Sequence, residues 1–156
     1  MVLMKKLFTF CVTAMMAFTL SAQDSMTLSK GDMVAGFTYN SAYDNDNLTD
    51  DLAITIGYGI SDNFAIMATR DENNTGNDDA AINLGVRYFY NGFYGQLNMN
   101  DIQDATEADE DATLSIGKMF SLDWVDGLYV DPNMTLSRDD NDDTDMSFGM
   151  TLGMKF

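Results

Sequence analysis

The chain has 156 residues, a length typical of one domain, and it carries 25 acidic residues against 8 basic ones, a formal charge of −17. This charge excludes a basic face for nucleic acid, and the absence of histidine removes the usual general base and the commonest transition-metal ligand. A hydrophobic content of 46% with 12% aromatic residues excludes a disordered acidic chain.

Residues 1–22 read as a secretory signal peptide. Lys5 and Lys6 precede an apolar run over 7–20, too short to span a membrane as a helix, and Ala22 supplies a small residue for cleavage. The only cysteine, Cys11, lies in this segment, so the mature chain would have no disulfide, zinc–thiolate site or thiol nucleophile. Removing two lysines leaves 6 basic and 25 acidic residues, and 6 − 25 gives a charge of −19.

After Gln23 the chain alternates large apolar residues with small or polar ones, the period of two that is typical of β-strands. Eight such runs are expected, at 31–40, 52–60, 63–70, 80–90, 93–100, 112–120, 127–138 and 146–156. Their lengths, about 8 to 12 residues, match the roughly 9–11 residues of a transmembrane strand.

The links between runs alternate in length. Short links at 61–62, 91–92 and 121–126 define a short-turn end, and Asn91-Gly92 is a strong signal for a tight hairpin. The other four links define a loop end and hold 19 of the 25 acidic residues; they are 41–51, 71–79, 101–111 and 139–145. This alternation predicts an up-and-down meander with one strongly negative end, and both termini of the mature chain fall at the short-turn end.

The composition of the smaller-residue face predicts which side of the sheet meets water. That face is small and almost uncharged, with residues such as Gly36, Thr38, Thr55, Gly57, Gly85, Ser115, Gly117 and Thr151. Such residues suit the filled interior of an eight-stranded barrel, whereas the outside of a soluble barrel would be rich in charge. We therefore expect an all-β fold over 23–156: an eight-stranded antiparallel up-and-down transmembrane β-barrel, closed because unpaired backbone is not tolerated in lipid.

Aromatic residues gather at the short-turn end, where an interfacial belt is expected. They are Tyr58, Phe64, Tyr88, Tyr90, Phe93, Tyr94, Phe120, Trp124 and Phe156.

With its export signal, eight runs and alternating links, the chain resembles the small eight-stranded outer-membrane barrels of Gram-negative bacteria, such as OmpX-like and OmpW-like proteins and the barrel half of OmpA. The resemblance implies localisation in the outer membrane, contact with its lipid, short turns in the periplasm and acidic loops outside the cell. It also implies that the last strand is an assembly signal read by the barrel-assembly machinery, carried by Phe148, Met150, Leu152, Met154 and Phe156.

Two residues fit this pattern poorly. Pro132 lies inside the seventh run and has no N–H to pair, which predicts either a bulge or a strand that begins near Asn133. Lys118 shares the parity of Leu114 and Ile116, so it either points outward near the interface or changes face through a bulge at Gly117.

Two charged residues, Arg87 and Asp131, share the inward face. Because charges this deep should be paired, we expect a polar network in the lumen formed by Arg87, Asp131, Asn83, Gln96 and Asn98, with Tyr129 and Asn133 as further candidates. The network is either a structural plug or a gate in a narrow ion path.

The acidic loops, notably 139–145 and 44–47, offer the oxygen ligands that Ca²⁺ prefers, but without the glycine turn and distal Glu of an EF-hand. We expect no cofactor and no dedicated metal site, with weak Ca²⁺ binding by the loops as the alternative. Without His or a mature-chain Cys, catalysis has little support, so we expect no enzyme.

The expected function is that of a monomeric outer-membrane barrel with a structural or surface-interaction role through its acidic loops. One alternative is a narrow channel or a conduit for small or hydrophobic solutes. The other is a soluble periplasmic ligand-binding barrel.

Overall fold

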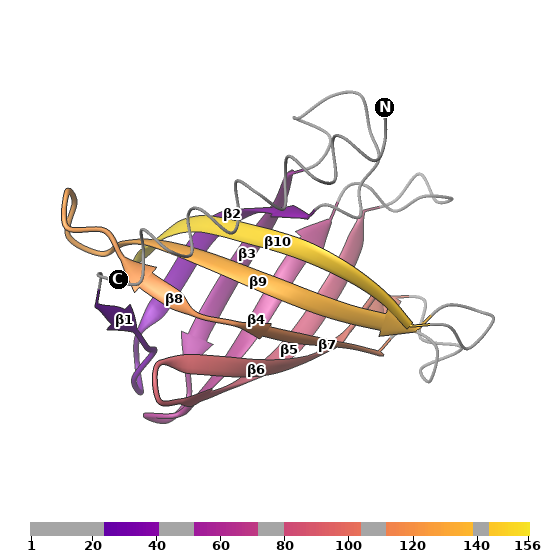
Figure 1. Ribbon diagram of the computed structural model, residues 1–156, viewed down its shortest axis with the longest axis horizontal. Helices are drawn as coiled ribbons and strands as arrows, with labels where there is room; N and C mark the ends of the chain where they lie inside the picture. The colour runs from indigo at the N-terminus through magenta and orange to yellow at the C-terminus, as the bar shows by residue number, and fades with distance from the viewer. Residues whose placement is uncertain (1–23, 41–51, 72–79, 104–111, 139–143) are drawn as a thin grey trace.

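The computed structural model describes residues 24–40, 52–71, 80–103, 112–138 and 144–156. Within them ten strands form one antiparallel sheet, in the order β1-β8-β9-β10-β2-β3-β4-β5-β6-β7, and β7 also pairs with β9. That additional pairing closes the sheet into a barrel (Figure 1). Because β7 and β8 are two parts of one barrel strand and β1 is not a member of the closed ring, the barrel has eight strands, as the sequence predicts.

The strand bounds lie close to the predicted runs. They are β1 Ser25–Met26, β2 Met33–Asn40, β3 Leu52–Gly59, β4 Phe64–Asp71, β5 Ala81–Tyr90, β6 Phe93–Met99, β7 Ala112–Gly117, β8 Met119–Ser121, β9 Leu128–Arg138 and β10 Thr144–Lys155. Neighbours along the chain pair from β2 through β7, which is the expected up-and-down meander.

Both explanations offered above for Pro132 are wrong. Strand β9 runs unbroken through this residue and pairs with β10 there without a bulge, Met150 opposite Pro132. The interruption falls instead on the neighbouring strand, where Lys118 separates β7 from β8. Lys118 donates its N–H to the Pro132 carbonyl at 3.3 Å, so the missing N–H of the proline faces the Lys118 carbonyl and leaves that ladder position unpaired.

There is no bulge at Gly117, and Lys118 keeps the register of β7 and β8. The pairs Gly117–Asn133 and Phe120–Val130 keep one register across the interruption. The Lys118 ammonium lies 5.1 Å from the ring centre of Phe93 and 4.9 Å from that of Phe120. Such cation–π contacts hold the charged group at the short-turn end of the barrel.

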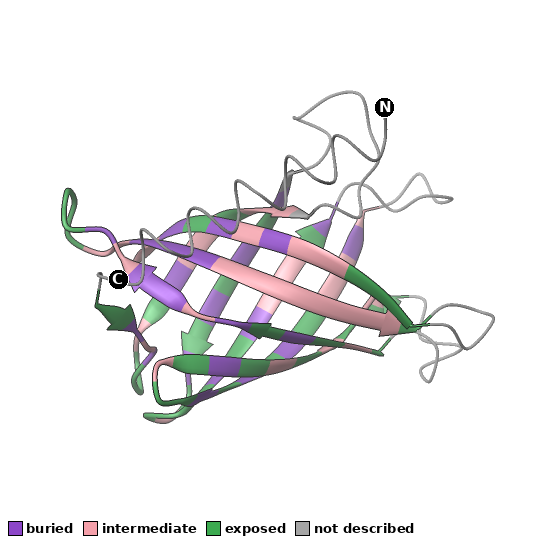
Figure 2. Ribbon diagram, in the orientation of Figure 1, coloured by how far each residue is buried: buried purple, intermediate pink, exposed green. Residues whose placement is uncertain are grey.

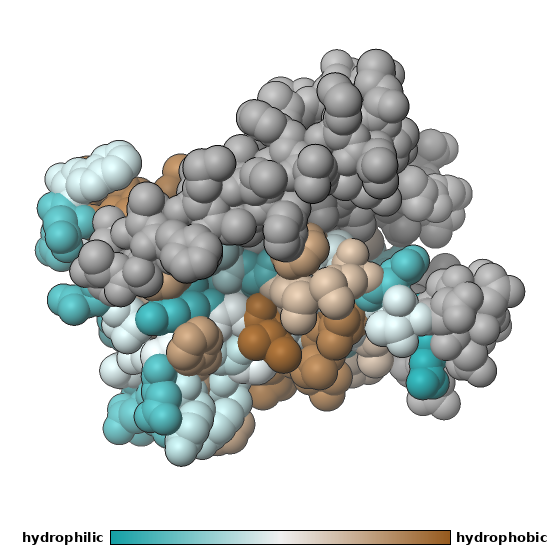
Figure 3. Space-filling view, viewed as in Figure 1, coloured by the Kyte–Doolittle hydropathy of each residue, from teal (hydrophilic) through white to brown (hydrophobic). Residues whose placement is uncertain are grey.

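Most large apolar side chains of the strands point away from the lumen, and a smaller set that includes Met67, Phe89 and Met119 points inward. Ile54, Ile56 and Leu84 are 48%, 55% and 39% exposed, while the alternate residues Ala53, Thr55 and Ala65 are buried. Figure 2 shows this alternation as bands of buried and exposed residues along the strands. On the face drawn in Figure 3, hydrophobic residues gather over the middle of the barrel and hydrophilic ones lie toward its ends.

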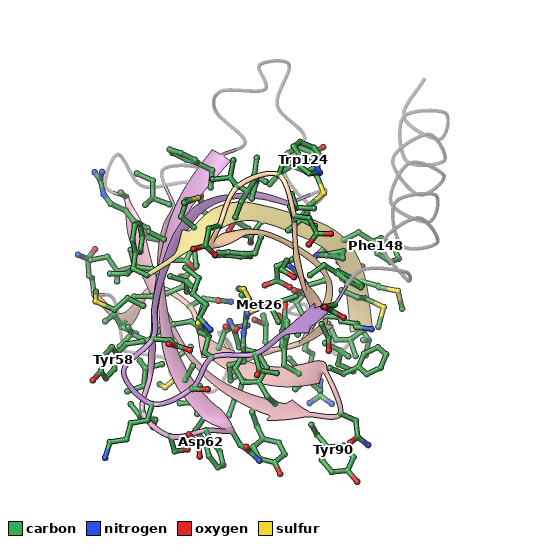
Figure 4. The ribbon with its side chains drawn as sticks, turned by 90° about the vertical axis from the view of Figure 1, so that its left-hand side faces the viewer. Met26, Tyr58, Asp62, Tyr90, Trp124 and Phe148 are labelled. Atoms are coloured by element: carbon green, nitrogen blue, oxygen red, sulfur yellow. The ribbon has the colours of Figure 1, made fainter. Side chains whose placement is uncertain are left out.

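Two aromatic residues that the sequence pattern assigned to an outer belt are buried. Tyr94 points into the lumen and is 3% exposed, and Phe120 packs against Leu122 and Val130. Tyr94 shares the parity of Gln96 on β6, and this parity, rather than its aromatic character, fixes its direction. The belt residues Tyr58, Tyr90 and Trp124 do point outward (Figure 4).

The predicted turns at the short-turn end are present. Asn91 and Gly92 both have positive φ, 51° and 80°, as a two-residue type I′ hairpin requires. The link between β3 and β4 runs over residues 60–63, slightly longer than predicted. At the loop end, most of the four acidic links lies outside the described residues.

The sequence pattern did not predict a structured segment before the first barrel strand. Residues 24–32 turn into the short-turn end, and β1 pairs with β8 there, Met26 opposite Met119. In Figure 4, which looks into this end, Met26 lies in the middle of the ring of strands. It belongs to the main apolar cluster inside the barrel, together with Leu28, Val34, Ala65, Met67, Phe89, Tyr94, Met119 and Tyr129.

Candidate functional site

The lumen contains a buried ion pair. Arg87 on β5 and Asp131 on β9 are 5% and 1% exposed, and Arg87 Nη1 lies 2.9 Å from Asp131 Oδ2. The strands are three places apart around the ring, so the pair crosses the interior. The inward positions of Arg87 and Asp131 follow from their strand parity, and the closure of the barrel brings them into contact.

Tyr94 joins the two charged residues from a third strand. Its hydroxyl donates a hydrogen bond to Asp131 Oδ1 at 2.7 Å, and its ring lies beneath the Arg87 guanidinium, 3.6 Å from ring centre to Cζ. Asp131 is therefore held by a different partner on each carboxylate oxygen. Tyr94 was not among the residues predicted for the network, although the strand parity that it shares with Gln96 places it inside.

Arg87 also contacts acceptors on two further strands, β6 and β8. Arg87 Nε donates to Gln96 Oε1 at 2.6 Å, and Nη1 contacts Met119 Sδ at 3.2 Å. Gln96 in turn donates to Asn98 Oδ1, which extends the network along β6. Arg87, Asp131, Gln96 and Asn98 thus form one connected chain, as the sequence analysis grouped them.

Asn83 lies apart from this chain. Its side-chain oxygen accepts a hydrogen bond from the backbone N–H of Asp101 at 2.8 Å, at the loop-end side of β5 and β6. The other candidate, Asn133, donates to the backbone carbonyl of Asp131 at 3.3 Å. Tyr129 is 1% exposed and packs in the apolar cluster beside the ion pair.

Hydroxyl groups line the lumen on the loop-end side of the ion pair. Thr38 on β2 bonds both Thr151 on β10 and Thr55 on β3, at 2.7 and 2.8 Å, and Thr55 bonds Thr69 on β4 at 2.9 Å.

A second series crosses β6, β7 and β9: Asn98 donates to Ser115 at 3.1 Å, and Ser115 bonds Thr135 at 2.8 Å. These bonds join inward side chains of adjacent strands and so brace the barrel wall from inside.

The arrangement is suited to holding the barrel together. A buried charge is strongly destabilising when left alone, and Arg87 has partners on β6, β8 and β9. The apolar cluster fills the adjacent space with Met67, Phe89 and Met119, each almost fully buried. Side chains from both groups therefore occupy the interior at this level, as expected for a ring of eight strands.

The residues of the terminal strand that the resemblance marks as an assembly signal face outward. Leu152 and Phe156 are exposed, Phe148, Met150 and Met154 are partly exposed, and Phe148 points away from the ring in Figure 4. Phe156 also exchanges two backbone hydrogen bonds with Met33, so the end of the chain is tied to the start of β2.

Comparisons with protein-family models, with curated proteins and with solved structures found no match. In the described part of the chain, no helix is long and apolar enough to cross a membrane. The described residues also contain no cluster of three or more metal-ligating side chains. Of the acidic segments considered for Ca²⁺, 44–47 lies wholly outside the described residues and 139–145 lies outside them except for Thr144 and Asp145.

Proposed function

We propose that this protein is a monomeric barrel of a bacterial outer membrane, with a structural or surface-interaction role exerted through its acidic loops. The observation that carries the proposal is the outward face of the barrel. Exposed Ile, Leu, Val, Phe and Met residues cover it, and inward positions hold the hydroxyls, the ion pair and one apolar cluster. A water-soluble barrel places its apolar side chains inside, and a lipid-embedded one places them outside.

The distribution of aromatic residues supports the same proposal. Tyr58, Phe64, Tyr88, Tyr90 and Phe93 are exposed, and they lie on strand ends at the short-turn end. Phe64 and Tyr88 also pack together, with ring centres 4.8 Å apart. An aromatic girdle at one edge of the apolar band is typical of membrane barrels, because these rings favour the interface between lipid and water.

The contents of the lumen argue against bulk transport. The ion pair of Arg87 and Asp131, the ring of Tyr94 and the apolar cluster occupy the interior near the short-turn end. The proposed contact with the surroundings is therefore made by the loop end, whose links carry 19 of the 25 acidic residues. Neither an enzymatic activity nor a bound cofactor is part of the proposal.

Two measurements test this proposal. The protein expressed with its own residues 1–22 should fractionate with outer membranes and require detergent for extraction. On a gel run in dodecyl sulfate, the unboiled protein should migrate faster than the boiled one, because a closed membrane barrel resists the detergent until heated. Recovery of the folded protein in the soluble periplasmic fraction would contradict the proposal and favour a soluble ligand-binding barrel.

Conductance across planar lipid bilayers separates the proposed role from the channel alternative. We expect no steady single-channel openings from the purified protein, because buried side chains fill the interior. Reproducible openings of uniform size would favour a narrow conduit.

A further inference from the structure

The segment that precedes the barrel is built into its short-turn end. Leu28 is 0% exposed and Met26 is 9% exposed, and both pack with inward residues of the barrel such as Ala65 and Met119. Because these apolar side chains pack against the inward residues at the short-turn opening, the segment acts as a plug of that opening. Residues 24–32 are called the plug segment below.

The plug segment pairs with the part of β8 that has no partner from β6. Strand β6 begins at Phe93, so β8 extends beyond it and would leave a free edge at Met119–Ser121. Strand β1 pairs with that edge, and Ser121 also donates its backbone N–H to the Asp24 carbonyl at 3.2 Å. The segment thereby covers an edge that would otherwise be open to pairing with another chain.

A latch fastens the other side of the plug segment to the last strand. Lys155 Nζ on β10 lies 2.8 Å from Asp32 Oδ2 and 3.4 Å from the Thr27 carbonyl oxygen. The same Asp32 oxygen accepts the backbone N–H of Ser29 at 2.7 Å, which fixes the turn between the plug segment and β2. Both side chains of this ion pair are partly exposed to solvent, unlike the pair of Arg87 and Asp131.

The plug segment packs so closely against Gly59, the last residue of β3, that no side chain would fit at this position. A Cβ atom on Gly59 would lie 2.0 Å from the Ser29 carbonyl oxygen, a backbone atom that no side-chain rotation can move. The two backbones are also joined by hydrogen bonds, from Gly31 N to the Gly59 carbonyl and from Gly59 N to the Asp32 carbonyl, both 2.9 Å. The barrel wall therefore requires a glycine at the point where the plug segment touches it.

We propose that residues 24–32 are a releasable plug that closes the short-turn mouth of the lumen and is held there by the Lys155–Asp32 latch. Its release exposes the inward residues around Arg87 to water from the short-turn end. Release is easier than unfolding of the barrel, because the segment is held by the packing of Met26 and Leu28, a two-residue strand, a few backbone bonds and a partly exposed ion pair. The eight-stranded ring does not depend on the segment for its closure.

The test uses a cysteine as a reporter beneath the plug. Ala65→Cys places a small thiol at an inward, fully buried position of the apolar cluster, in a full chain that also carries Cys11→Ser. Modification of this thiol by a water-soluble maleimide is then compared between the reporter alone and the reporter combined with Gly59→Ala. The matched control is Gly95→Ala, because a Cβ on Gly95 has no atom within 4 Å.

We expect slow modification of the reporter alone and of its Gly95→Ala control, and modification at least about tenfold faster with Gly59→Ala. Lys155→Met, which removes the ion pair with Asp32 and the contact with the Thr27 carbonyl, should also accelerate modification. Circular dichroism must show unchanged strand content in each variant. Equal rates in all variants, or a reporter that is already modified rapidly with the plug intact, would overturn the proposal.

If Gly59→Ala fails to fold, the decision rests on Lys155→Met and on Asp32→Asn, which changes the other side of the latch. Faster modification in both variants supports the plug. Unchanged rates in both variants refute it. Because this reporter measures access from water at one mouth, its result is independent of whether the barrel lies in a membrane.

Discussion

Arg87 and Asp131 are 44 residues apart in the chain, yet Arg87 Nη1 and Asp131 Oδ2 lie 2.9 Å apart inside the barrel. The contact joins strands that do not pair with each other and so depends on closure of the ring. Removing one partner leaves the other as an uncompensated buried charge, which costs about 3–5 kcal/mol.

Arg87→Ala should therefore lower the free energy of unfolding by about 3–5 kcal/mol. The measurement is the temperature at which the folded, fast-migrating form disappears from gels. The control is the double variant Arg87→Met with Asp131→Leu, which removes both charges and should be more stable than Arg87→Ala. An unchanged transition temperature in Arg87→Ala would contradict the importance of the pair.

Tyr94→Phe should lower the free energy of unfolding by about 1–3 kcal/mol, because Asp131 Oδ1 loses its hydroxyl donor inside the barrel. The aromatic ring beneath Arg87 remains, so the change isolates the hydrogen bond. Tyr90→Phe is the matched control, since Tyr90 is 66% exposed and its loss of a hydroxyl should have almost no effect. Equal stabilities of the two variants, measured by urea unfolding, would show that the bond contributes nothing.

Ile56→Lys discriminates between a lipid-facing and a water-facing outer surface. Ile56 lies near the middle of β3 and points outward, so a lysine there should cost about 2–4 kcal/mol of unfolding free energy in lipid vesicles. Trp124→Lys, in the turn between β8 and β9, should cost at most about 1 kcal/mol because it lies at the short-turn end. If both changes stay within about 0.5 kcal/mol, as exposed substitutions in soluble proteins do, the membrane proposal fails.

The latch predicts a pH dependence. The hydrogen bond from Lys155, followed by that from the Ser29 N–H, lowers the pKa of Asp32 below its usual value of 3.8. A carboxyl group with a lowered pKa stabilises the fold fully above its unfolded pKa, and this contribution is lost as the pH falls through the folded pKa. Asp32→Asn should thus melt below the wild type at neutral pH, with a difference that disappears as the pH decreases below that lowered pKa.

The check is a series of thermal unfolding transitions from about pH 7 to about pH 2 on both proteins. Asp62→Asn, in an exposed turn at the same end, serves as a control for the change of net charge. A difference between wild type and Asp32→Asn that persists at the lowest pH would show that it does not arise from ionisation of Asp32.

Pro132→Ala should join β7 and β8 into one strand. The new N–H of residue 132 faces the Lys118 carbonyl, so it should form the missing ladder bond and exchange slowly with deuterium. Protection equal to that of its neighbours in β9, measured by exchange and nuclear magnetic resonance, is the expected result. Exchange as fast as that of turn amides would show that another feature separates the two strands.

The sequence by itself determined the positions of the barrel strands, the direction of their large side chains and the two kinds of link. These are local properties. Alternation with a period of two shows which residues share a face of the sheet, and Asn91-Gly92 specifies its own turn. For the same reason Arg87 and Asp131 could be placed inside before any contact was known. The parity of Tyr94 held the same information, but its aromatic character led to an assignment in the outer belt.

Only the tertiary structure decided which inward residues meet. The register and closure of the ring bring Arg87 to Asp131 and Tyr94 and leave Asn83 near Asp101, and no pattern within a single strand carries that information. The plug segment was likewise hidden, because residues 24–32 have no extended alternation and acquire their place from the free edge of β8 and the space beside Gly59. Contacts across a lumen are set by how strands are arranged around it, and that arrangement exists only once the sheet has closed.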